Sequence, residues 1–132
     1  MKRLLPVFLL LALALSGCAA LAQPPKTAQG YRRITMLEAA QWMEAEEGYI
    51  LLDVRTAQEF AAGHIPGATL LPNETIGAQE IAQLPDKDQL IMVYCRSGNR
   101  SQQAADKLTR LGYTNIVEIG GINSWPGEIV KD

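Results

Sequence analysis

The chain has 132 residues, of which 48% are hydrophobic and 20% are charged, and its formal net charge is −2. This length supports one small domain, and the lack of a basic patch argues against nucleic acid as a partner. Two cysteines and one histidine exclude a multi-bridge disulfide framework and the common zinc ligand sets, so we expect no metal site.

The first predicted element is an export signal. A basic start at residues 2–3 precedes an apolar run over residues 4–15, which is too short to span a bilayer. Small residues then lead to Cys18, and this pattern resembles the signal peptide of bacterial lipoproteins. The resemblance implies that residues 1–17 are removed and that Cys18 is lipidated. An ordinary signal peptide cut near Ala19-Ala20 or Ala22, with loss of Cys18, is the alternative.

The lipoprotein interpretation predicts where the mature protein lies. We expect an exported protein held on a bacterial membrane by its N-terminal lipid, facing the periplasm or the cell exterior. In bacterial lipoproteins, an aspartate directly after the lipidated cysteine is linked to retention in the inner membrane. Ala19 occupies that position here, which favours the outer membrane if the cell has one. Residues 18–30 lack apolar periodicity and are rich in turn formers, so we predict a flexible tether before a domain over residues 31–132.

Strand and helix patterns alternate along the predicted domain. Thr35 with Glu38, and Thr56 with Glu59, have the spacing of helix N-terminal capping boxes. Apolar runs predict strands near Ile34 and over residues 49–54, 69–71, 90–94 and 115–119. Helical spacing predicts helices from Thr35 to Gly48 with Met36, Leu37, Ala40 and Met43 on one face, from Thr56 to Gly63, over residues 74–84 and 101–111, and around Trp125.

This alternation predicts an α/β fold, with a parallel β-sheet flanked by helices on both faces in a single domain. In such sheets, ligands bind beyond the carboxyl ends of the strands. Asp53-Val54-Arg55 and Tyr94-Cys95-Arg96 both end predicted strands, so we expect them to meet at one site.

Cys95 is the candidate nucleophile. It ends an apolar strand, a short polar loop with Gly98 follows, and a helix then begins. Backbone N–H groups and the positive end of the helix dipole would favour the thiolate over the thiol. Arg96 and Arg100 add positive charge, and Gly98 permits a positive φ in the loop. The pattern therefore predicts a thiolate in a site that binds an anion.

Several separate motifs together resemble the rhodanese domain. They occur in the family's order: Leu52-Asp53-Val54-Arg55, Glu59-Phe60, Gly63-His64-Ile65-Pro66-Gly67-Ala68, Cys95-Arg96-Ser97-Gly98-Asn99-Arg100-Ser101, and Gly120-Gly121 with Trp125 and Gly127. The likeness covers nearly all of residues 31–132. It implies a parallel sheet flanked by helices and the transfer of sulfur from thiosulfate, or a related small anionic donor, to cyanide or a thiol.

The resemblance also implies how the reaction proceeds. Cys95 would carry the transferred sulfur as a covalent persulfide, so no cofactor is expected. The backbone N–H groups of the loop from Arg96 to Ser101 would stabilise the negative charge. Arg96 and Arg100 would attract the donor, although Arg100 is equally compatible with a structural role.

The remaining polar residues have structural interpretations beside the functional ones. Ser97, Asn99 and Ser101 are suited either to substrate contact or to capping the helix. Asp53 and Arg55, with Glu59, are predicted to form a supporting ion-pair set at the sheet edge. His64, the single histidine, lies in a turn that we predict to be structural. A catalytic role is not expected for it, because a thiolate formed by loop electrostatics needs no general base.

Two alternative functions stay open. Cysteine phosphatases and arsenate reductases of rhodanese fold also place a cysteine loop at a helix N-terminus, but with five residues between cysteine and arginine. This chain has the four residues from Arg96 to Asn99, which suits a single sulfur atom better. The second alternative is a sulfur-carrier module without turnover of its own.

Overall fold

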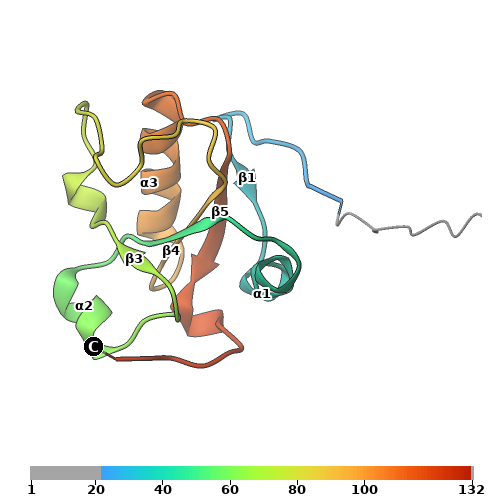
Figure 1. Cartoon of the computed structure of the whole chain (residues 1–132), viewed down its shortest axis with the longest axis vertical. Coiled ribbons are helices and arrows are strands. Elements are labelled where there is room, and N and C mark those ends of the chain that lie inside the picture. Colours follow the sequence, from blue (N-terminus) through green and yellow to red (C-terminus); the bar gives the residue numbers. More distant parts are fainter. Residues whose placement is uncertain (1–21, 132) are drawn as a thin grey trace, which may run out of the picture.

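The computed structural model describes residues 22–131 (Figure 1). The predicted signal peptide and the lipidation residue Cys18 lie outside these residues. Within the described part, no helix combines the length and the apolar character needed to cross a membrane. The last residues of the predicted tether contact the domain, because Lys26 Nζ donates to the carbonyl of Thr114 at 2.8 Å.

A five-stranded parallel sheet forms the centre of the described domain, with strand order β1-β5-β4-β2-β3. The strands are β1 Arg32–Arg33, β2 Ile50–Asp53, β3 Thr69–Leu70, β4 Ile91–Cys95 and β5 Ile116–Gly121. The helices are α1 Met36–Ala45, α2 Ala57–Ala62 and α3 Asn99–Arg110, with the 3₁₀ turns η1 Asn73–Thr75 and η2 Ile122–Ser124. The predicted α/β fold is confirmed.

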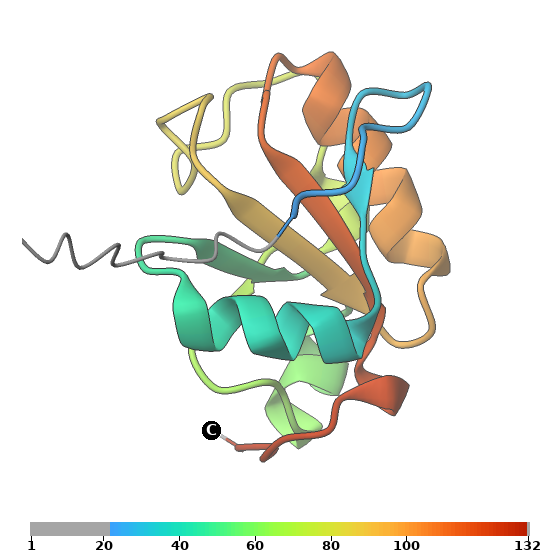
Figure 2. The ribbon, with the colours of Figure 1, turned by 90° about the vertical axis from the view of Figure 1, so that its right-hand side faces the viewer.

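The two faces of the sheet bury separate apolar layers. Side chains alternate along β4, so Val93 and Cys95 face α3 while Met92 and Tyr94 face α1. Figures 1 and 2 show α1 and α3 on opposite sides of the sheet. Every residue of β4 is buried, as expected for a central parallel strand, and its carboxyl end carries Cys95.

The two capping signals at threonine place their helices correctly. The Thr35 side chain accepts from the backbone N–H of Glu38, and the Glu38 carboxylate accepts from the backbone N–H of Thr35 at 2.7 Å. Helix α1 begins at Met36, directly after Thr35. Thr56 likewise accepts from the Glu59 N–H, and Gly63 ends α2. The buried face of α1 differs from the prediction, since it consists of Met36, Ala39 and Trp42.

Leu37, which the helical pattern assigned to the buried face of α1, is 60% exposed. The 3.6-residue period fixes a stripe only to within one position, and the packing of α1 on the sheet selects the stripe that carries Trp42. The first strand also differs by one residue: it ends at Arg33, and the backbone N–H of Ile34 continues the edge by donating to the Glu118 carbonyl at 3.1 Å.

The predicted helix over residues 74–84 is wrong. Only the 3₁₀ turn η1 forms there, and the chain then follows turns to Pro85. This irregular segment still contributes separate buried side chains to the core, namely Ile76, Ile81 and Leu84. Gly77 weakens the helix, and burial of single side chains from turns replaces the continuous helical face. The predicted helix around Trp125 is likewise only η2, which ends just before that residue.

Candidate active site

Cys95 lies where β4 passes into α3. It is buried at 1% exposure, and it is the free thiol of the described residues. Gly98 follows at the helix N-cap with φ 106°, so the expected positive φ in the loop is confirmed. The helix starts at Asn99, two residues earlier than predicted, because the glycine turn brings the chain into helical geometry without a side-chain cap.

The sulfur of Cys95 is held by the loop that follows it. The backbone N–H of Gly98 donates to Sγ at 3.0 Å, and Ser101 Oγ lies 3.4 Å from Sγ. Burial acts to raise the pKa of the Cys95 thiol, but the Ser101 hydroxyl and the backbone N–H groups of Ser101, Gly98 and Ser97 outweigh it, so the pKa is lowered. The site therefore favours a thiolate at lower pH than an ordinary thiol requires.

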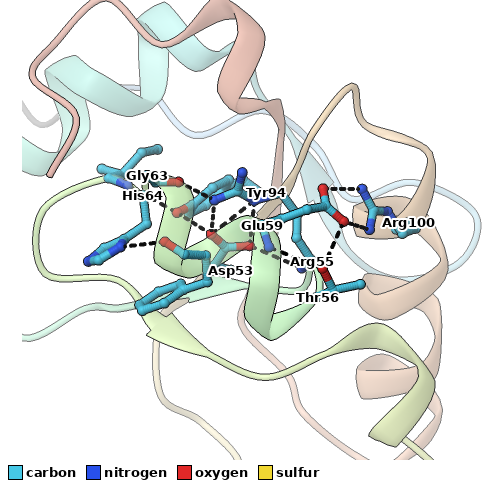
Figure 3. A network of polar contacts seen from close by, with 10 residues as sticks. Asp53, Arg55, Thr56, Glu59, Gly63, His64, Tyr94 and Arg100 are labelled. Atoms are coloured by element: carbon cyan, nitrogen blue, oxygen red, sulfur yellow. Dashed lines mark hydrogen bonds and ion pairs between the residues drawn. The ribbon is translucent and has the colours of Figure 1, made fainter. Parts of the chain in front are cut away.

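Arg100 is fixed by an ion pair with α2. Its two terminal nitrogens donate to the two carboxylate oxygens of Glu59 at 2.7 and 2.9 Å (Figure 3). The hydrogen bonds from Arg100 lower the pKa of Glu59 to about 2. Arg100 therefore ties α3 to α2, and its charge is shared with a carboxylate. Glu59 was expected to join Asp53 and Arg55, and it pairs with Arg100 of α3 instead.

The other polar residues of the loop lie at its surface. Arg96, Ser97 and Asn99 are exposed, whereas Ser101 is completely buried. Neither Ser97 nor Asn99 makes a side-chain cap on α3. Arg96 is therefore the loop cation whose side chain is open to solvent, and Ser101 is the loop hydroxyl that reaches the sulfur.

Asp53 and Arg55 form a buried pair beside this loop. Arg55 donates from Nε at 2.9 Å and from a terminal nitrogen at 2.6 Å to the Asp53 carboxylate. Tyr94 Oη donates to the same carboxylate at 2.7 Å, and Arg55 also donates to the Gly63 carbonyl at 2.7 Å (Figure 3). Burial raises the pKa of Tyr94, which keeps it a donor. The pair thus joins the ends of β2 and β4 to the end of α2.

His64 belongs to the structural side of this network. Its ring stacks on Phe60 with 3.8 Å between centroids, and Nδ1 lies 2.9 Å from the Phe60 carbonyl. Its backbone bridges to Val130. Figure 3 shows His64 and Arg100 at opposite ends of the polar network, with Asp53 and Arg55 between them. These contacts place the imidazole in the packing between α2 and the C-terminal segment.

The sequence interpretation missed the part that Glu118 plays. This carboxylate is 1% exposed on β5, and Oε1 accepts from Ser101 Oγ at 2.6 Å and from the Gly120 N–H at 2.8 Å. Arg33 Nε donates to its other oxygen at 3.2 Å. A signal was present, because a charged residue interrupts the apolar run Ile116–Ile119. A cavity of about 410 Å³ lies beside Glu118 and Ser97.

The absence of a side chain at Gly121 lets the Cys95 loop pack closely against β5. A Cβ at this position would lie within 2.6 Å of the Ser97 Cα and would collide with the Arg96 carbonyl. The Cα of Gly121 pairs with Cys95 across β4 and β5, where the register shifts. The loop therefore packs directly on the bare backbone of β5.

Replacing Gly121 by alanine is expected to displace the loop. The clash costs about 1–3 kcal/mol of unfolding free energy, and Cys95 reacts more slowly with iodoacetamide at neutral pH because its N–H donors no longer converge. Gly77→Ala is the matched control, since a Cβ there meets open space. Denaturant titration and timed alkylation of both variants test this, and equal behaviour of the two would contradict it.

The residues of the described part do not assemble a metal site: no group of three or more histidine, cysteine, aspartate or glutamate side chains is placed to hold an ion. What the arrangement offers is a single activated thiol in a positively polarised loop. Such a group can attack an electrophilic atom and carry the product covalently.

Comparison with known proteins agrees with the residue patterns. A family model described as "Rhodanese-like domain" matches residues 35–128. Thiosulfate sulfurtransferase GlpE of Pseudomonas entomophila is 40% identical over 90 residues, which cover 64% of this chain and 81% of the relative. Probable adenylyltransferase/sulfurtransferase MoeZ of Mycobacterium tuberculosis is 32% identical over 117 residues, covering 87% of this chain. The match spans only 30% of the MoeZ length.

A solved structure of similar shape is described as "rhodanese with anions from E. coli". It is 32% identical, with a TM-score of 0.58, and the match covers 64% of this chain and 99% of that chain. The similarity therefore extends over nearly the whole of a solved rhodanese.

Proposed function

The chain belongs to the rhodanese-like domain family, and we propose that it transfers sulfane sulfur from thiosulfate or a related small anion to cyanide or a thiol. The observation that carries this proposal is the Cys95 thiol with the Gly98 N–H at 3.0 Å from its sulfur. Similarity to a thiosulfate sulfurtransferase over 90 residues supports it at the level of the reaction class.

In the first step of the proposed reaction, a sulfur atom is transferred to Cys95. The Cys95 thiolate attacks the outer sulfur of thiosulfate, and a bond forms between these two sulfur atoms. The bond between the two sulfurs of thiosulfate breaks, and its electron pair leaves with sulfite. The protein is left with a persulfide, Cys95–S–S⁻, and no external oxidant or reductant is consumed.

The second step discharges the persulfide. Cyanide or a thiolate attacks the terminal sulfur, the persulfide S–S bond breaks, and its electron pair returns to Cys95 as a thiolate. Two separate displacements at one nucleophile give ping-pong kinetics. Cyanide leaves as thiocyanate, and a thiol acceptor leaves as a persulfide.

The loop suits both steps because the negative charge stays close to the Cys95 sulfur, first on the thiolate and then on the persulfide. The Gly98 N–H and the N-terminal end of α3 lie at the sulfur and favour an anion there. Arg96, exposed at the rim, would attract the incoming donor, while Arg100 is held by Glu59 and keeps the helix in position. Asp53 and Arg55 support the strand ends from the buried side.

Thiocyanate formation from thiosulfate and cyanide tests this proposal. The folded protein is expected to turn over with parallel lines in a double-reciprocal plot, and to leave an aryl phosphate and arsenate unchanged. A protein that hydrolyses the phosphate or reduces arsenate without forming thiocyanate would contradict the proposal in favour of phosphatase-like chemistry. One sulfur bound per chain without turnover would restrict the role to that of a carrier.

We also propose that Cys18 carries a lipid that holds this domain at a bacterial membrane, facing the periplasm or the cell exterior. The support is the sequence pattern before Cys18. Cys18 lies before the described residues, and Lys26, eight residues later in the chain, contacts the domain at the Thr114 carbonyl.

Cys18→Ser is expected to release the protein from the membrane without changing its sulfur transfer, because Cys18 and Cys95 belong to separate parts of the chain. Fractionation with labelled fatty acid measures attachment, and thiocyanate formation measures activity. Wild-type protein that is unlabelled and wholly soluble would contradict the anchor and leave the sulfurtransferase proposal untouched.

A further inference from the structure

The hydroxyl of Ser101 has more acceptors around it than hydrogens to give. A serine hydroxyl donates one hydrogen bond. Ser101 Oγ lies 2.6 Å from Glu118 Oε1, 3.0 Å from the Gly98 carbonyl and 3.4 Å from Cys95 Sγ. The contact with the carboxylate is the shortest, and charge-assisted O–H···O⁻ bonds have this length. The hydrogen therefore points to Glu118, and the sulfur faces a lone pair of the oxygen.

Three donors converge on Glu118, as expected for an ionised carboxylate. Besides Ser101, the Gly120 N–H donates at 2.8 Å and Arg33 donates at 3.2 Å. Glu118 is buried, whereas the Arg33 side chain is 53% exposed, so the carboxylate is fixed mainly by the protein's own backbone and by Ser101. This arrangement holds the carboxylate one hydroxyl away from the nucleophile.

We propose that Glu118 is a positioning residue that holds the Ser101 hydroxyl hydrogen away from the Cys95 sulfur. With the carboxylate in place, Ser101 accepts from the thiol, and Glu118 competes with the thiolate for the single hydroxyl hydrogen. Without it, the same hydroxyl would turn and donate to the sulfur. Glu118 therefore keeps Cys95 more basic than the Gly98 N–H and the helix end alone would make it.

The other charged groups around Cys95 are already paired or exposed, so they do not replace this effect. They come from α3, α2, the end of β2 and the loop: Arg100 with Glu59, Arg55 with Asp53, and the exposed Arg96. Each of these contacts is separate from the one between Ser101 and Glu118. Substitution of Glu118 also removes a negative charge near the thiolate and the partner of Arg33, and the Ser101→Ala background separates this direct effect from the effect through the hydroxyl.

A more basic Cys95 has a consequence that rests on the proposed sulfur transfer. The cysteine thiolate is the nucleophile when the persulfide forms and the leaving group when the persulfide discharges. A higher thiol pKa strengthens the nucleophile and makes the leaving group worse. At a pH where the thiolate is already formed, Glu118 therefore favours rapid loading and slow release, which suits a protein that holds sulfur until an acceptor arrives.

The pH dependence of Cys95 alkylation by iodoacetamide tests the proposal without any sulfur transfer. Glu118→Gln removes the charge, and its amide can donate to Ser101 Oγ, so the midpoint is expected to fall by about one pH unit. Glu44→Gln, on the exposed side of α1, is the matched control and is expected to leave the midpoint unchanged. An unchanged or raised midpoint in folded Glu118→Gln would overturn the proposal.

A second pair of variants tests whether Glu118 acts through Ser101. In a Ser101→Ala background, adding Glu118→Gln is expected to move the midpoint much less than in the wild type. A shift of equal size in both backgrounds would contradict positioning through the hydroxyl. Glu118→Met, which also removes the acceptor, replaces Glu118→Gln if the latter does not fold, and the same downward shift is expected.

Persulfide kinetics then connect the residue to function. Protein loaded with thiosulfate and mixed with cyanide is expected to discharge about threefold faster in Glu118→Gln than in wild type. Slower or equal discharge together with a lowered midpoint would contradict the loading-and-release role. If neither protein accepts sulfur from thiosulfate, the sulfurtransferase proposal fails, while the alkylation midpoints still decide the role of Glu118.

Discussion

Cys95→Ala is expected to abolish thiocyanate formation, with a loss of about 10³-fold or more, because the proposed persulfide forms on the sulfur that this substitution removes. The fold should survive. The side chain is small, and its removal from the core costs about 1 kcal/mol, a typical value for a single substitution.

Cys18→Ser is the matched control for this variant, because it removes the other thiol of the chain. Turnover is compared at equal concentrations of folded protein, with folding followed by circular dichroism and thermal melting. Near wild-type turnover in folded Cys95→Ala would contradict covalent catalysis at this residue. An equal loss in Cys18→Ser would contradict the separation of the anchor from the site.

Asp53→Asn is expected to destabilise the protein by about 3–5 kcal/mol, the largest stability effect of any single substitution proposed for this chain. The change keeps the size of the side chain but leaves the Arg55 guanidinium, at 6% exposure, without its counter-charge. The Tyr94 hydroxyl also loses its carboxylate acceptor. Because these groups join β2, β4 and α2, we expect the Cys95 loop to lose order with them.

Asp106→Asn is the matched control, since Asp106 pairs with Arg110 one helical turn away on the surface of α3. Such a pair contributes less than about 0.5 kcal/mol. Urea denaturation of both variants gives the two free energies of unfolding. A loss below about 1 kcal/mol in Asp53→Asn would show that the buried pair does not anchor the site.

The sequence predicted the architecture because its signals are local. Threonine caps three residues before a glutamate place the starts of α1 and α2, and a glycine ends α2. Apolar runs that end in Asp53 and Cys95 place two strand ends side by side, because carboxyl ends of parallel strands share one edge. The position of the Cys95 loop, between a strand and a helix, was predicted in the same way from the apolar run before Cys95 and the glycine after it.

The remaining features depend on contacts between distant elements, which one sequence does not encode locally. Arg100 and Glu59 lie on different helices, 41 residues apart in the chain, and only the folded arrangement brings this pair together. Glu118 looks like an interruption of a strand until Ser101 is seen beside it. The segment over residues 74–84 has helical spacing, but separate burial of its apolar side chains decides its conformation.

Intact mass after exposure to thiosulfate tests sulfur transfer through Cys95 most directly. Wild-type protein is expected to gain the mass of one sulfur atom, to lose it again on addition of cyanide, and to resist alkylation at the free thiol while it is loaded. Cys95→Ala is expected to gain nothing. Absence of the sulfur adduct in folded wild-type protein whose Cys95 still reacts with iodoacetamide, or the same adduct in Cys95→Ala, would contradict a persulfide on this residue.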